Sequence, residues 1–211
     1  MALAENGVYT TVMMTVKSPI KAASDAASPL PPIDRTLVLV GLMGAGKTTV
    51  GRRLARRLGL SFADSDHEVE QAAGMSVAEI FEAYGEAEFR AVERRVIARL
   101  LDGKPKVVAT GGGAFINAET RGLIQETGLS IWLDADVSVL VERTGRRDTR
   151  PLLKGGDPRQ ILTRLAAERS PIYAEARLRV VSGDGPHEGV VERVLAALDT
   201  FYEAERSPHV C

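Results

Sequence analysis

Residues 41–48 read Gly-Leu-Met-Gly-Ala-Gly-Lys-Thr and match the pattern G-x-x-x-x-G-K-[ST] at every position. An apolar, β-branched run at 36–40 precedes the motif, and residues 47–58 follow it with apolar side chains at helical spacing. Glycines in such a strand-to-helix turn let backbone N–H groups converge on a polyphosphate at the start of the helix. The alternative is a glycine-rich turn without a ligand, which the flanking strand and helix disfavour. The motif therefore predicts that the chain binds a nucleoside triphosphate.

The motif also assigns roles to its own residues. The residues expected to hold the nucleotide are Gly44, Ala45, Gly46, Lys47, Thr48 and Thr49. The ammonium group of Lys47 can reach the β- and γ-phosphates, and the hydroxyl of Thr48 can bind Mg²⁺. We therefore expect Lys47 to take part in chemistry at the phosphates.

The composition excludes several classes of protein. The chain has 211 residues, of which 45% are hydrophobic and 26% charged, as suits one soluble α/β domain. A formal net charge of −1 gives no reason to expect a nucleic-acid or membrane partner, and no apolar run approaches the roughly 18 residues of a membrane span. The single cysteine, Cys211, cannot form an internal disulfide. We expect a cytoplasmic monomer.

The first 34 residues differ from the rest of the chain. They are rich in Ala, Ser, Thr and Pro and show no sustained helical or strand period. They have neither the basic start and apolar core of a secretory signal nor the arginine-rich, acid-poor composition of a transit peptide. We expect a disordered extension over 1–34, one domain over 35–205 and a short tail over 206–211.

From residue 35 onward, strand and helix patterns alternate, which predicts an α/β domain with a parallel sheet wrapped by helices. The expected strands are 36–40, 61–63, 107–109, 129–133 and 178–181. The expected helices are 47–58, 76–81, 86–101, one capped by Asn117, 136–143, 157–170 and 187–204. Ligands of such sheets bind beyond the carboxyl ends of the strands, where the phosphate loop and residues 64–66 and 110–113 all lie. Three loops are therefore expected to form one crevice.

Two carboxylates, Asp64 and Asp66, follow the second strand. The third strand ends in Ala109 and Thr110, where many phosphate-loop proteins carry a metal-binding aspartate, so Asp64 is the candidate to bind Mg²⁺ beside Thr48. Asp66 can accept the proton of an attacking hydroxyl and orient it toward the γ-phosphate. The alternative is that Asp66 only caps the helix that follows.

Two further segments are open to two interpretations each. Gly111, Gly112 and Gly113 either form a floor where backbone approaches a polar ligand too closely for any Cβ, or a loose turn. The arginine-rich segment 143–150 is either a solvated loop or a mobile lid. As a lid it would bring Arg150 onto the bridge between the β- and γ-phosphates, where an arginine accelerates phosphoryl transfer.

Two other arginines cannot be assigned from spacing. Arg90 has Glu93 one turn further on, so a surface ion pair would explain it. Arg169 stands at the expected end of a helix, where the helix dipole favours a cation.

Taken together, the motifs resemble those of the shikimate kinase family. Six motifs occur in the order and spacing of that family. They are the phosphate loop with Met43, Asp64-Ser65-Asp66, Gly85-Glu86 with Phe89-Arg90, Thr110-Gly111-Gly112-Gly113, Arg150-Pro151-Leu152-Leu153 and Glu168-Arg169-Ser170-Pro171-Ile172-Tyr173. The resemblance covers about residues 35–205. It implies ATP- and Mg²⁺-dependent phosphorylation of the 3-hydroxyl of shikimate, a step toward chorismate and the aromatic amino acids. It also implies a three-layer α/β/α fold of the nucleoside-monophosphate-kinase type, with a central five-stranded parallel sheet, the phosphate-loop strand at its centre, and a mobile lid.

The resemblance extends to individual residues. The residues implied to bind shikimate are Asp66, Arg90, Gly111, Gly112, Gly113 and Arg169, with the two arginines on its carboxylate. By the same resemblance Glu93 would orient Arg90, and Phe81 and Phe89 would wall the ring. Arg143 would lie near the adenine and Arg150 on the phosphates, so that the implied catalytic residues are Lys47, Asp66 and Arg150. The loop 182–186 departs from the family pattern because it is short and lacks a basic residue, which leaves Pro186 as the candidate to pack against the base.

Two other functions remain possible on the sequence alone. One is a sibling kinase for gluconate or a nucleoside monophosphate, against which Arg90, Arg169 and the three glycines argue jointly. The other is a nucleotide-dependent regulatory module that transfers no phosphate. The motifs N-K-x-D and D-x-x-G of guanine-nucleotide switches do not occur, and Lys47, Asp66 and Arg150 are all present.

Overall fold

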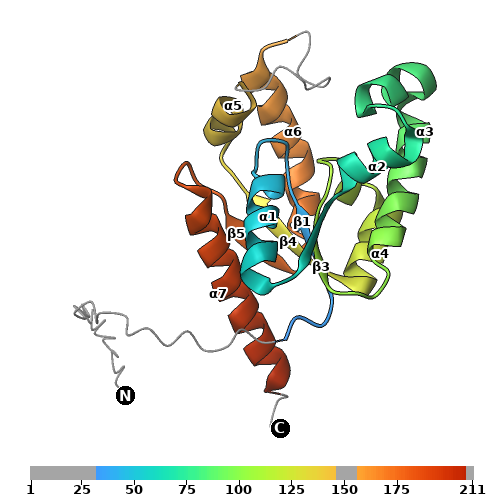
Figure 1. The fold of residues 1–211 in the computed structure, drawn as a ribbon. Helices are drawn as coiled ribbons and strands as arrows, with labels where there is room; N and C mark the ends of the chain where they lie inside the picture. The colour runs from blue at the N-terminus through green and yellow to red at the C-terminus, as the bar shows by residue number, and fades with distance from the viewer. Residues whose placement is uncertain (1–31, 146–155, 208–211) are drawn as a thin grey trace, which may run out of the picture.

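The computed structural model describes residues 32–145 and 156–207, which fold around a five-stranded parallel sheet (Figure 1). Predictions for residues 1–31, for Arg150 and most of the expected lid, and for residues 208–211 lie outside these ranges. The elements, in chain order, are β1 (Thr36–Val40), α1 (Lys47–Leu58), β2 (Ser61–Asp64), α2 (Ser65–Ala73), α3 (Val77–Leu100), β3 (Lys106–Ala109), the 3₁₀ turn η1 (Ala114–Ile116), α4 (Ala118–Thr127), β4 (Gly128–Asp134), α5 (Val137–Gly145), α6 (Pro158–Tyr173), β5 (Leu178–Val181) and α7 (His187–Arg206).

The strand order is β2-β3-β1-β4-β5, so β1 lies at the centre of the sheet. Leu37 pairs with Val107 of β3 on one side and with Leu129 of β4 on the other, in parallel register. All five residues of β1 are buried, as expected for a strand covered on both faces. The phosphate loop therefore leaves the sheet from its central strand, and the predicted fold class, apart from the lid, is confirmed.

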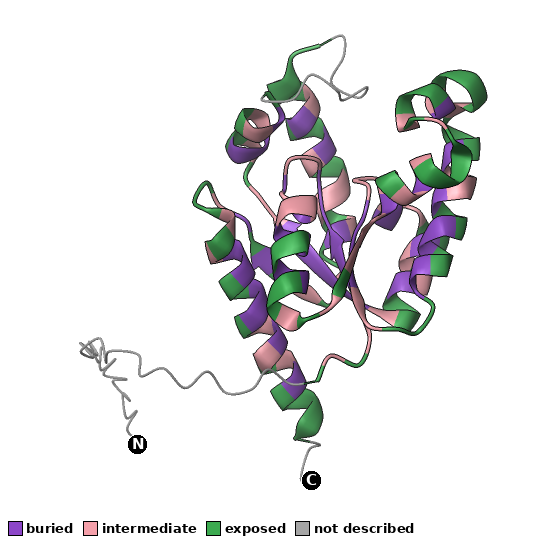
Figure 2. Ribbon diagram, in the orientation of Figure 1, coloured by how far each residue is buried: buried purple, intermediate pink, exposed green. Residues whose placement is uncertain are grey.

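The helices cover both faces of the sheet. Helices α1 and α7 pack against each other on one face, and α4 and α6 lie on the opposite face (Figure 1). Buried residues follow the sheet and the inner sides of these helices (Figure 2). A smaller apolar cluster forms where α2 and α3 pack beside β3; it contains Val69, Ile80, Phe89, Val96, Leu100 and Val108. That second cluster anchors the helix that carries Arg90.

Several helix ends match the sequence signals. Gly59 ends α1 in the left-handed conformation, with φ of 65°. Ser76 and Glu79 form the predicted capping box of α3, with Glu79 Oε2 accepting from the Ser76 backbone N–H at 2.7 Å. Asn117 caps α4 and Asp157 caps α6, each by accepting a backbone N–H bond.

Three boundaries differ from the prediction. The break expected between helices at 76–81 and 86–101 is present, because α3 is divided into two helices at Gly85, where φ is 78° and ψ is 176°, but the first helix continues past residue 81 to that break. Such a backbone conformation is open to glycine alone. Helix α6 runs through Pro171 to Tyr173 instead of ending near residue 170, and Tyr173 is buried against Phe115 and Trp132. Burial of this ring favours the last helical turn despite the proline.

A third difference concerns the segment after β2, where residues 65–73 form the helix α2. Within the described part of the chain, no helix combines the length and the apolar character that crossing a membrane requires.

Candidate active site

The phosphate loop, residues 41–48, connects the carboxyl end of β1 to the first turn of α1. Gly41, Gly44 and Gly46 have φ angles of 132°, 84° and 93°, which L side chains rarely adopt. A Cβ built on Gly44 would also lie 3.0 Å from the Thr144 side chain, so α5 packs directly on the loop. The glycines are therefore required by the backbone conformation of the loop.

Lys47 is buried inside this loop. Its Nζ donates hydrogen bonds to the carbonyl oxygens of Gly41 at 2.7 Å and Leu42 at 2.9 Å. The ammonium group is thus held within the curve of the loop, where phosphate oxygens would offer it stronger, charge-assisted acceptors.

Thr48 and Asp64 bring two oxygen donors together at the start of α1. Thr48 Oγ1 donates to Asp64 Oδ2 at 2.7 Å, and Asp64 Oδ1 accepts from the Asp66 backbone N–H at 3.1 Å. Asp64 is therefore the residue that caps α2, and the alternative in which Asp66 serves only as that cap is wrong. A hydroxyl and a carboxylate fit Mg²⁺, which binds through one or two protein oxygens together with substrate phosphates and water.

The carboxyl group of Asp66, in the first turn of α2, faces the loop of three glycines. Burial and, secondarily, the neighbouring Asp64 carboxylate raise the pKa of Asp66 above its ordinary value. A Cβ built on Gly111 would come within 2.5 Å of Asp66 Oδ1 and 2.8 Å of Glu93 Oε1. The absence of a side chain at Gly111 is what gives both carboxyl groups their room.

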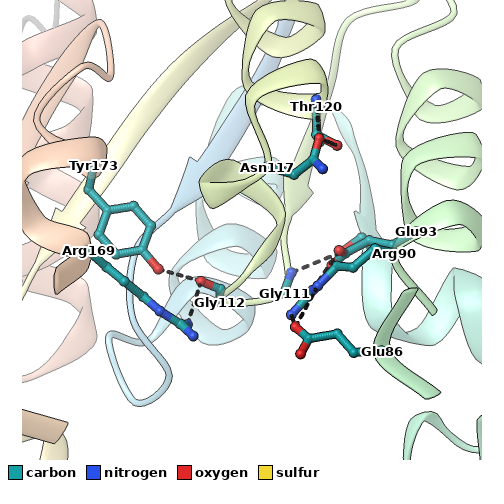
Figure 3. Close-up of polar contacts among 10 residues, drawn as sticks. Glu86, Arg90, Glu93, Gly111, Gly112, Asn117, Thr120, Arg169 and Tyr173 are labelled. Carbon is teal, nitrogen blue, oxygen red and sulfur yellow. Dashed lines mark hydrogen bonds and ion pairs between the residues drawn. The ribbon is translucent and has the colours of Figure 1, made fainter. Parts of the chain in front are cut away.

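Arg90 approaches the same loop from α3 (Figure 3). Its Nη1 donates to Glu93 Oε2 at 2.7 Å and its Nη2 to Glu86 Oε1 at 3.1 Å. Glu93 is only 2% exposed, so the pair is not the surface ion pair that the sequence left open. A Cβ built on Gly113 would overlap the Arg90 guanidinium. Gly113 is therefore required to be glycine because the Arg90 guanidinium occupies the space that a side chain would need.

The carboxyl groups beside Arg90 are held in a partly dehydrated environment. Burial raises the pKa of Glu93, and the Arg90 cation acts in the opposite direction. Glu93 Oε1 has no hydrogen-bond partner within the described part of the chain. One oxygen of Glu93 therefore holds Arg90 while the other faces the space next to Asp66 and Gly111.

Arg169 and Tyr173 approach the loop from the other side, on α6 (Figure 3). Arg169 Nη1 donates to the carbonyl oxygen of Gly112 at 3.3 Å, and the Tyr173 hydroxyl donates to the same oxygen. Burial raises the pKa of Tyr173 to about 12, so its hydroxyl remains a donor. The two arginines that spacing could not assign therefore flank one loop.

The loop is fixed on the sheet and adjoins the phosphate loop. The side chain of Thr110 donates to the carbonyl oxygen of Leu39 in β1 at 2.9 Å, and the backbone N–H of Gly111 donates to Ser65 Oγ at 3.0 Å. A Cβ built on Gly112 would lie 3.4 Å from the backbone nitrogen of Met43. The interpretation of residues 111–113 as a loose turn is therefore wrong.

The opposite flank of the phosphate loop contacts the segment after β5. Ser182 Oγ donates to the Ala45 carbonyl oxygen at 2.9 Å, and Arg143 of α5 donates to Ser182 Oγ at 3.2 Å and to the Gly183 carbonyl oxygen at 2.5 Å. Arg143 thus connects α5 to the loop 182–186. No site role was predicted for Ser182 or Tyr173, although Ser182 directly follows a strand end.

The aromatic residues of α3 pack as a pair. The ring centroids of Phe81 and Phe89 are 4.6 Å apart, and the Arg90 guanidinium carbon lies 5.0 Å from the Phe89 centroid. Phe89 is buried in the second apolar cluster, so it supports Arg90 from beneath.

Arg150, the predicted lid arginine, belongs to the residues outside the described ranges.

A phosphate loop, an aspartate beside it and two arginines on a glycine loop all meet at the carboxyl end of one parallel sheet. Fold and site together define a P-loop kinase that acts on a small molecule. The shikimate kinase family model matches residues 43–199, which is more than half of the chain. The chain belongs to the shikimate kinase family.

Individual relatives agree with the family model. The shikimate kinase of Caulobacter vibrioides is 60% identical over 164 residues, 78% of this chain and 82% of the relative. That of Paramagnetospirillum magneticum is 57% identical over 175 residues, 83% of this chain and 90% of the relative. The structure of shikimate kinase from Acinetobacter baumannii, solved in complex with shikimate, matches with a TM-score of 0.76 at 38% identity, and covers 82% of this chain and 96% of that one.

Proposed function

We propose that the protein transfers the γ-phosphoryl group of ATP to the 3-hydroxyl of shikimate, giving shikimate 3-phosphate and ADP. One observation carries the proposal. Three consecutive glycines, residues 111–113, adjoin Asp66, the phosphate loop and Arg90 in turn, and Arg169 donates to the middle one. An acceptor with a hydroxyl and a carboxylate on a small ring suits this set of residues, because its carboxylate would meet the two arginines and its hydroxyl would meet Asp66.

The two arginines are suited to a carboxylate. A guanidinium group presents a planar fork of donors that matches the two oxygens of a carboxylate, which a lysine ammonium does not. Glu93 accepts from Nη1 of Arg90 and thereby fixes the plane of the guanidinium. Arg169 is fixed from the other side by the Gly112 carbonyl oxygen.

Asp66 is the group that we propose to act on the acceptor hydroxyl. Its raised pKa makes it a better proton acceptor than an exposed aspartate, and it lies between the glycine loop and the phosphate loop. As the shikimate oxygen attacks, a bond forms from that oxygen to the γ-phosphorus and the bond from the γ-phosphorus to the bridging oxygen of ADP breaks. The hydroxyl proton passes to Asp66. Positioning by Asp66 and the two arginines supplies much of the rate, because phosphoryl transfer requires little covalent work from the protein.

The charge on the phosphates has to be neutralised during this step. Lys47 is already inside the phosphate loop, and we propose that Arg150 joins it from the lid segment. Mg²⁺ held by Thr48 and Asp64 would add positive charge at the phosphate oxygens. Gly44, Ala45, Gly46 and Thr49 complete the proposed nucleotide cradle, with Arg143 at its nucleoside end.

The remaining parts of the proposal concern the setting. We place the enzyme in the cytoplasm as a monomer, with a domain over 35–205 and tails on either side. The single cysteine, which allows no internal disulfide, supports a reducing compartment. A kinase for gluconate and a non-catalytic regulatory module are not favoured, because the relatives named above are shikimate kinases.

A coupled assay of ADP release tests the proposal. Shikimate, gluconate and a nucleoside monophosphate serve as separate acceptors with MgATP, and the phosphorylated product is identified by mass and by phosphorus NMR. We expect turnover with shikimate alone and a product phosphorylated at the 3-position. Turnover with gluconate instead, or binding of ATP and shikimate without product, would reject the proposal.

A further inference from the structure

His187, the first residue of α7, lies against the phosphate loop. A Cβ built on Gly46 would be 3.2 Å from Cε1 and 3.3 Å from Nδ1 of its imidazole ring, and 3.7 Å from Nη1 of Arg143. The segment before it also contacts the loop, since Ser182 Oγ donates to the Ala45 carbonyl oxygen. The residues from Ser182 to His187 therefore run along two consecutive residues of the loop that is proposed to hold the phosphates.

The Nδ1 atom of His187 is buried and has no hydrogen-bond partner within residues 32–145 and 156–207. A buried polar atom without a partner is uncommon in native proteins and costs stability. A histidine with a purely structural role would be expected to pair both ring nitrogens or to leave the free one in water. Nδ1 and the adjacent Cε1 form the edge of the ring that lies against Gly46, so the missing partner is expected on the side of the phosphate loop.

The charges around this ring favour its neutral form before a nucleotide binds. Burial lowers the pKa of His187, and the cations Arg143 of α5 and Arg53 of α1 lower it further. Glu188, the next residue, forms ion pairs with Arg53 at 3.8 Å and Arg57 at 3.5 Å, both on α1. The loop 182–186 has the sequence Ser-Gly-Asp-Gly-Pro and contributes no cation of its own.

We propose that His187 is a proton-linked contact of the nucleotide, whose ring takes up a proton when the nucleotide binds and donates a hydrogen bond from Nδ1 to a phosphate oxygen. The inference rests on the nucleotide-binding part of the proposed function and extends it to a residue outside the phosphate-loop motif. The proton comes from the solvent and forms an N–H bond on the ring, and no bond of the nucleotide forms or breaks.

The physical reason is the change of charge beside Gly46. A nucleotide brings several negative charges to within a few ångström of the ring, and an anion at that distance favours the imidazolium over the imidazole. The imidazolium then has a donor at Nδ1 and an acceptor within reach, which satisfies the atom that lacks a partner in the free protein. Nucleotide affinity is therefore expected to increase as the pH falls through the pKa of His187 in the complex.

The test is a calorimetric titration with MgADP, which requires no turnover, of the wild type, His187→Gln and the matched control His67→Gln. His67 is an exposed histidine on α2 whose Nε2 lies 3.1 Å from Gln71 Nε2, outside the nucleotide site. Affinity is measured at about pH 6 and about pH 8. Proton uptake is measured at about pH 6 in PIPES and in bis-Tris, whose ionisation enthalpies differ. Excess Mg²⁺ suppresses protonation of the nucleotide. Any proton uptake that does not depend on His187 remains in His187→Gln and is subtracted from the value of the control variant.

We expect the wild type and His67→Gln to take up protons on binding MgADP at about pH 6. Their affinity should be higher there than at about pH 8 by about threefold to tenfold, as a charge-assisted hydrogen bond would give. His187→Gln should lose the proton uptake and most of the pH dependence, with shikimate affinity unchanged. Equal loss of affinity at both pH values would show a packing role alone and would overturn the inference, as would unaltered proton uptake in His187→Gln.

A second measurement uses the unmodified protein. The NMR signal of the imidazole Cε1–H of His187, followed against pH with and without MgADP, should show a higher pKa in the complex than in the free protein. An unchanged pKa of His187 would also overturn the inference. If MgADP does not bind to the wild type at all, the proposed function fails together with it, whereas normal binding without proton linkage refutes this inference only.

Discussion

Arg90 and Glu93 form a hydrogen-bonded ion pair in which the carboxylate is buried and the guanidinium is partly open to the site, with 2.7 Å between Nη1 and Oε2. The same arginine also pairs with Glu86, whose side chain is 68% exposed. Arg90 thus has one buried acidic partner, Glu93, and one exposed acidic partner, Glu86. Glu93 therefore positions the guanidinium that we propose to bind the acceptor, whereas the pair with Glu86 is an ordinary surface interaction.

The first prediction compares Glu93→Gln with Glu86→Gln. Removing the buried charge leaves Arg90 without its main orienting partner, so Glu93→Gln should raise the KM for shikimate by about tenfold or more. An exposed pair contributes little, so Glu86→Gln should change the same KM by less than about twofold. Steady-state kinetics with each substrate varied in turn measures both effects. Equal changes in the two variants, or a matching rise in the KM for ATP, would contradict a role specific to the acceptor.

The second prediction concerns Asp66→Asn. The amide keeps the volume of the side chain but cannot take the hydroxyl proton, so kcat should fall by about 100-fold or more. An unchanged kcat would exclude the proposed role. Circular dichroism and shikimate binding establish that the variant is folded.

The same variant, Asp66→Asn, should be more stable against unfolding than the wild type although it is less active. Because the folded protein raises the pKa of Asp66, this carboxyl group favours folding when protonated and destabilises the fold as the pH rises through its pKa in the folded state. Asp66→Asn should therefore unfold at a higher temperature than the wild type at neutral pH, by roughly 2–4 °C for each 1 kcal/mol gained. The difference should shrink as the pH falls toward the ordinary aspartate pKa of 3.8. Thermal unfolding across that range would reject the idea if the difference grew on acidification.

The third prediction uses three glycines with different surroundings. Gly111→Ala would displace Asp66 and should mainly lower kcat, whereas Gly113→Ala would displace Arg90 and should mainly raise the KM for shikimate, each by about tenfold or more. Gly122 on α4 has no atom within 4 Å of a built Cβ, so Gly122→Ala should leave activity unchanged and stabilise the protein by about 0.5–1 kcal/mol. Steady-state kinetics and chemical unfolding test all three. A loss of kcat in the Gly122 variant, or the same kinetic defect in the other two, would show that the loop acts only through overall stability.

The fourth prediction concerns charge at the phosphates. Lys47→Ala should reduce kcat by about 1,000-fold or more, because the ammonium acts on charge that develops during transfer. Arg150→Ala should have a similar effect if the lid arginine acts as proposed. Both variants should still bind shikimate, which fluorescence or calorimetric titration can establish. A drop in kcat below about tenfold for either residue would remove it from the catalytic set.

Much of this architecture follows from local signals in the chain. The span of α1, its glycine end and the capping box at Ser76 depend on nearest neighbours and were predicted correctly. The convergence of three loops followed from the rule for strand ends in parallel sheets. The residues of a loop motif are neighbours in the sequence, and the meeting of strand ends follows from the alternation of strands and helices. Both features can therefore be predicted from one sequence.

The rest depends on contacts between segments distant in sequence. Whether Asp64 or Asp66 caps α2 depends on which carboxylate Thr48 and the glycine loop approach, and both have suitable spacing. The burial of Glu93 requires knowledge of how α3 packs beside β3. Helix α6 passes Pro171 because a ring two residues further on is buried in the core. Propensity alone predicts a stop at this position.

A Cβ built on Gly112 would lie 3.4 Å from the backbone nitrogen of Met43, so the proposed acceptor site and the proposed phosphate site lie next to each other. A compact inhibitor that combines a ring acid with a short phosphate mimic would therefore need almost no linker to occupy both. Medicinal chemistry on this enzyme can begin from fragments that straddle that boundary.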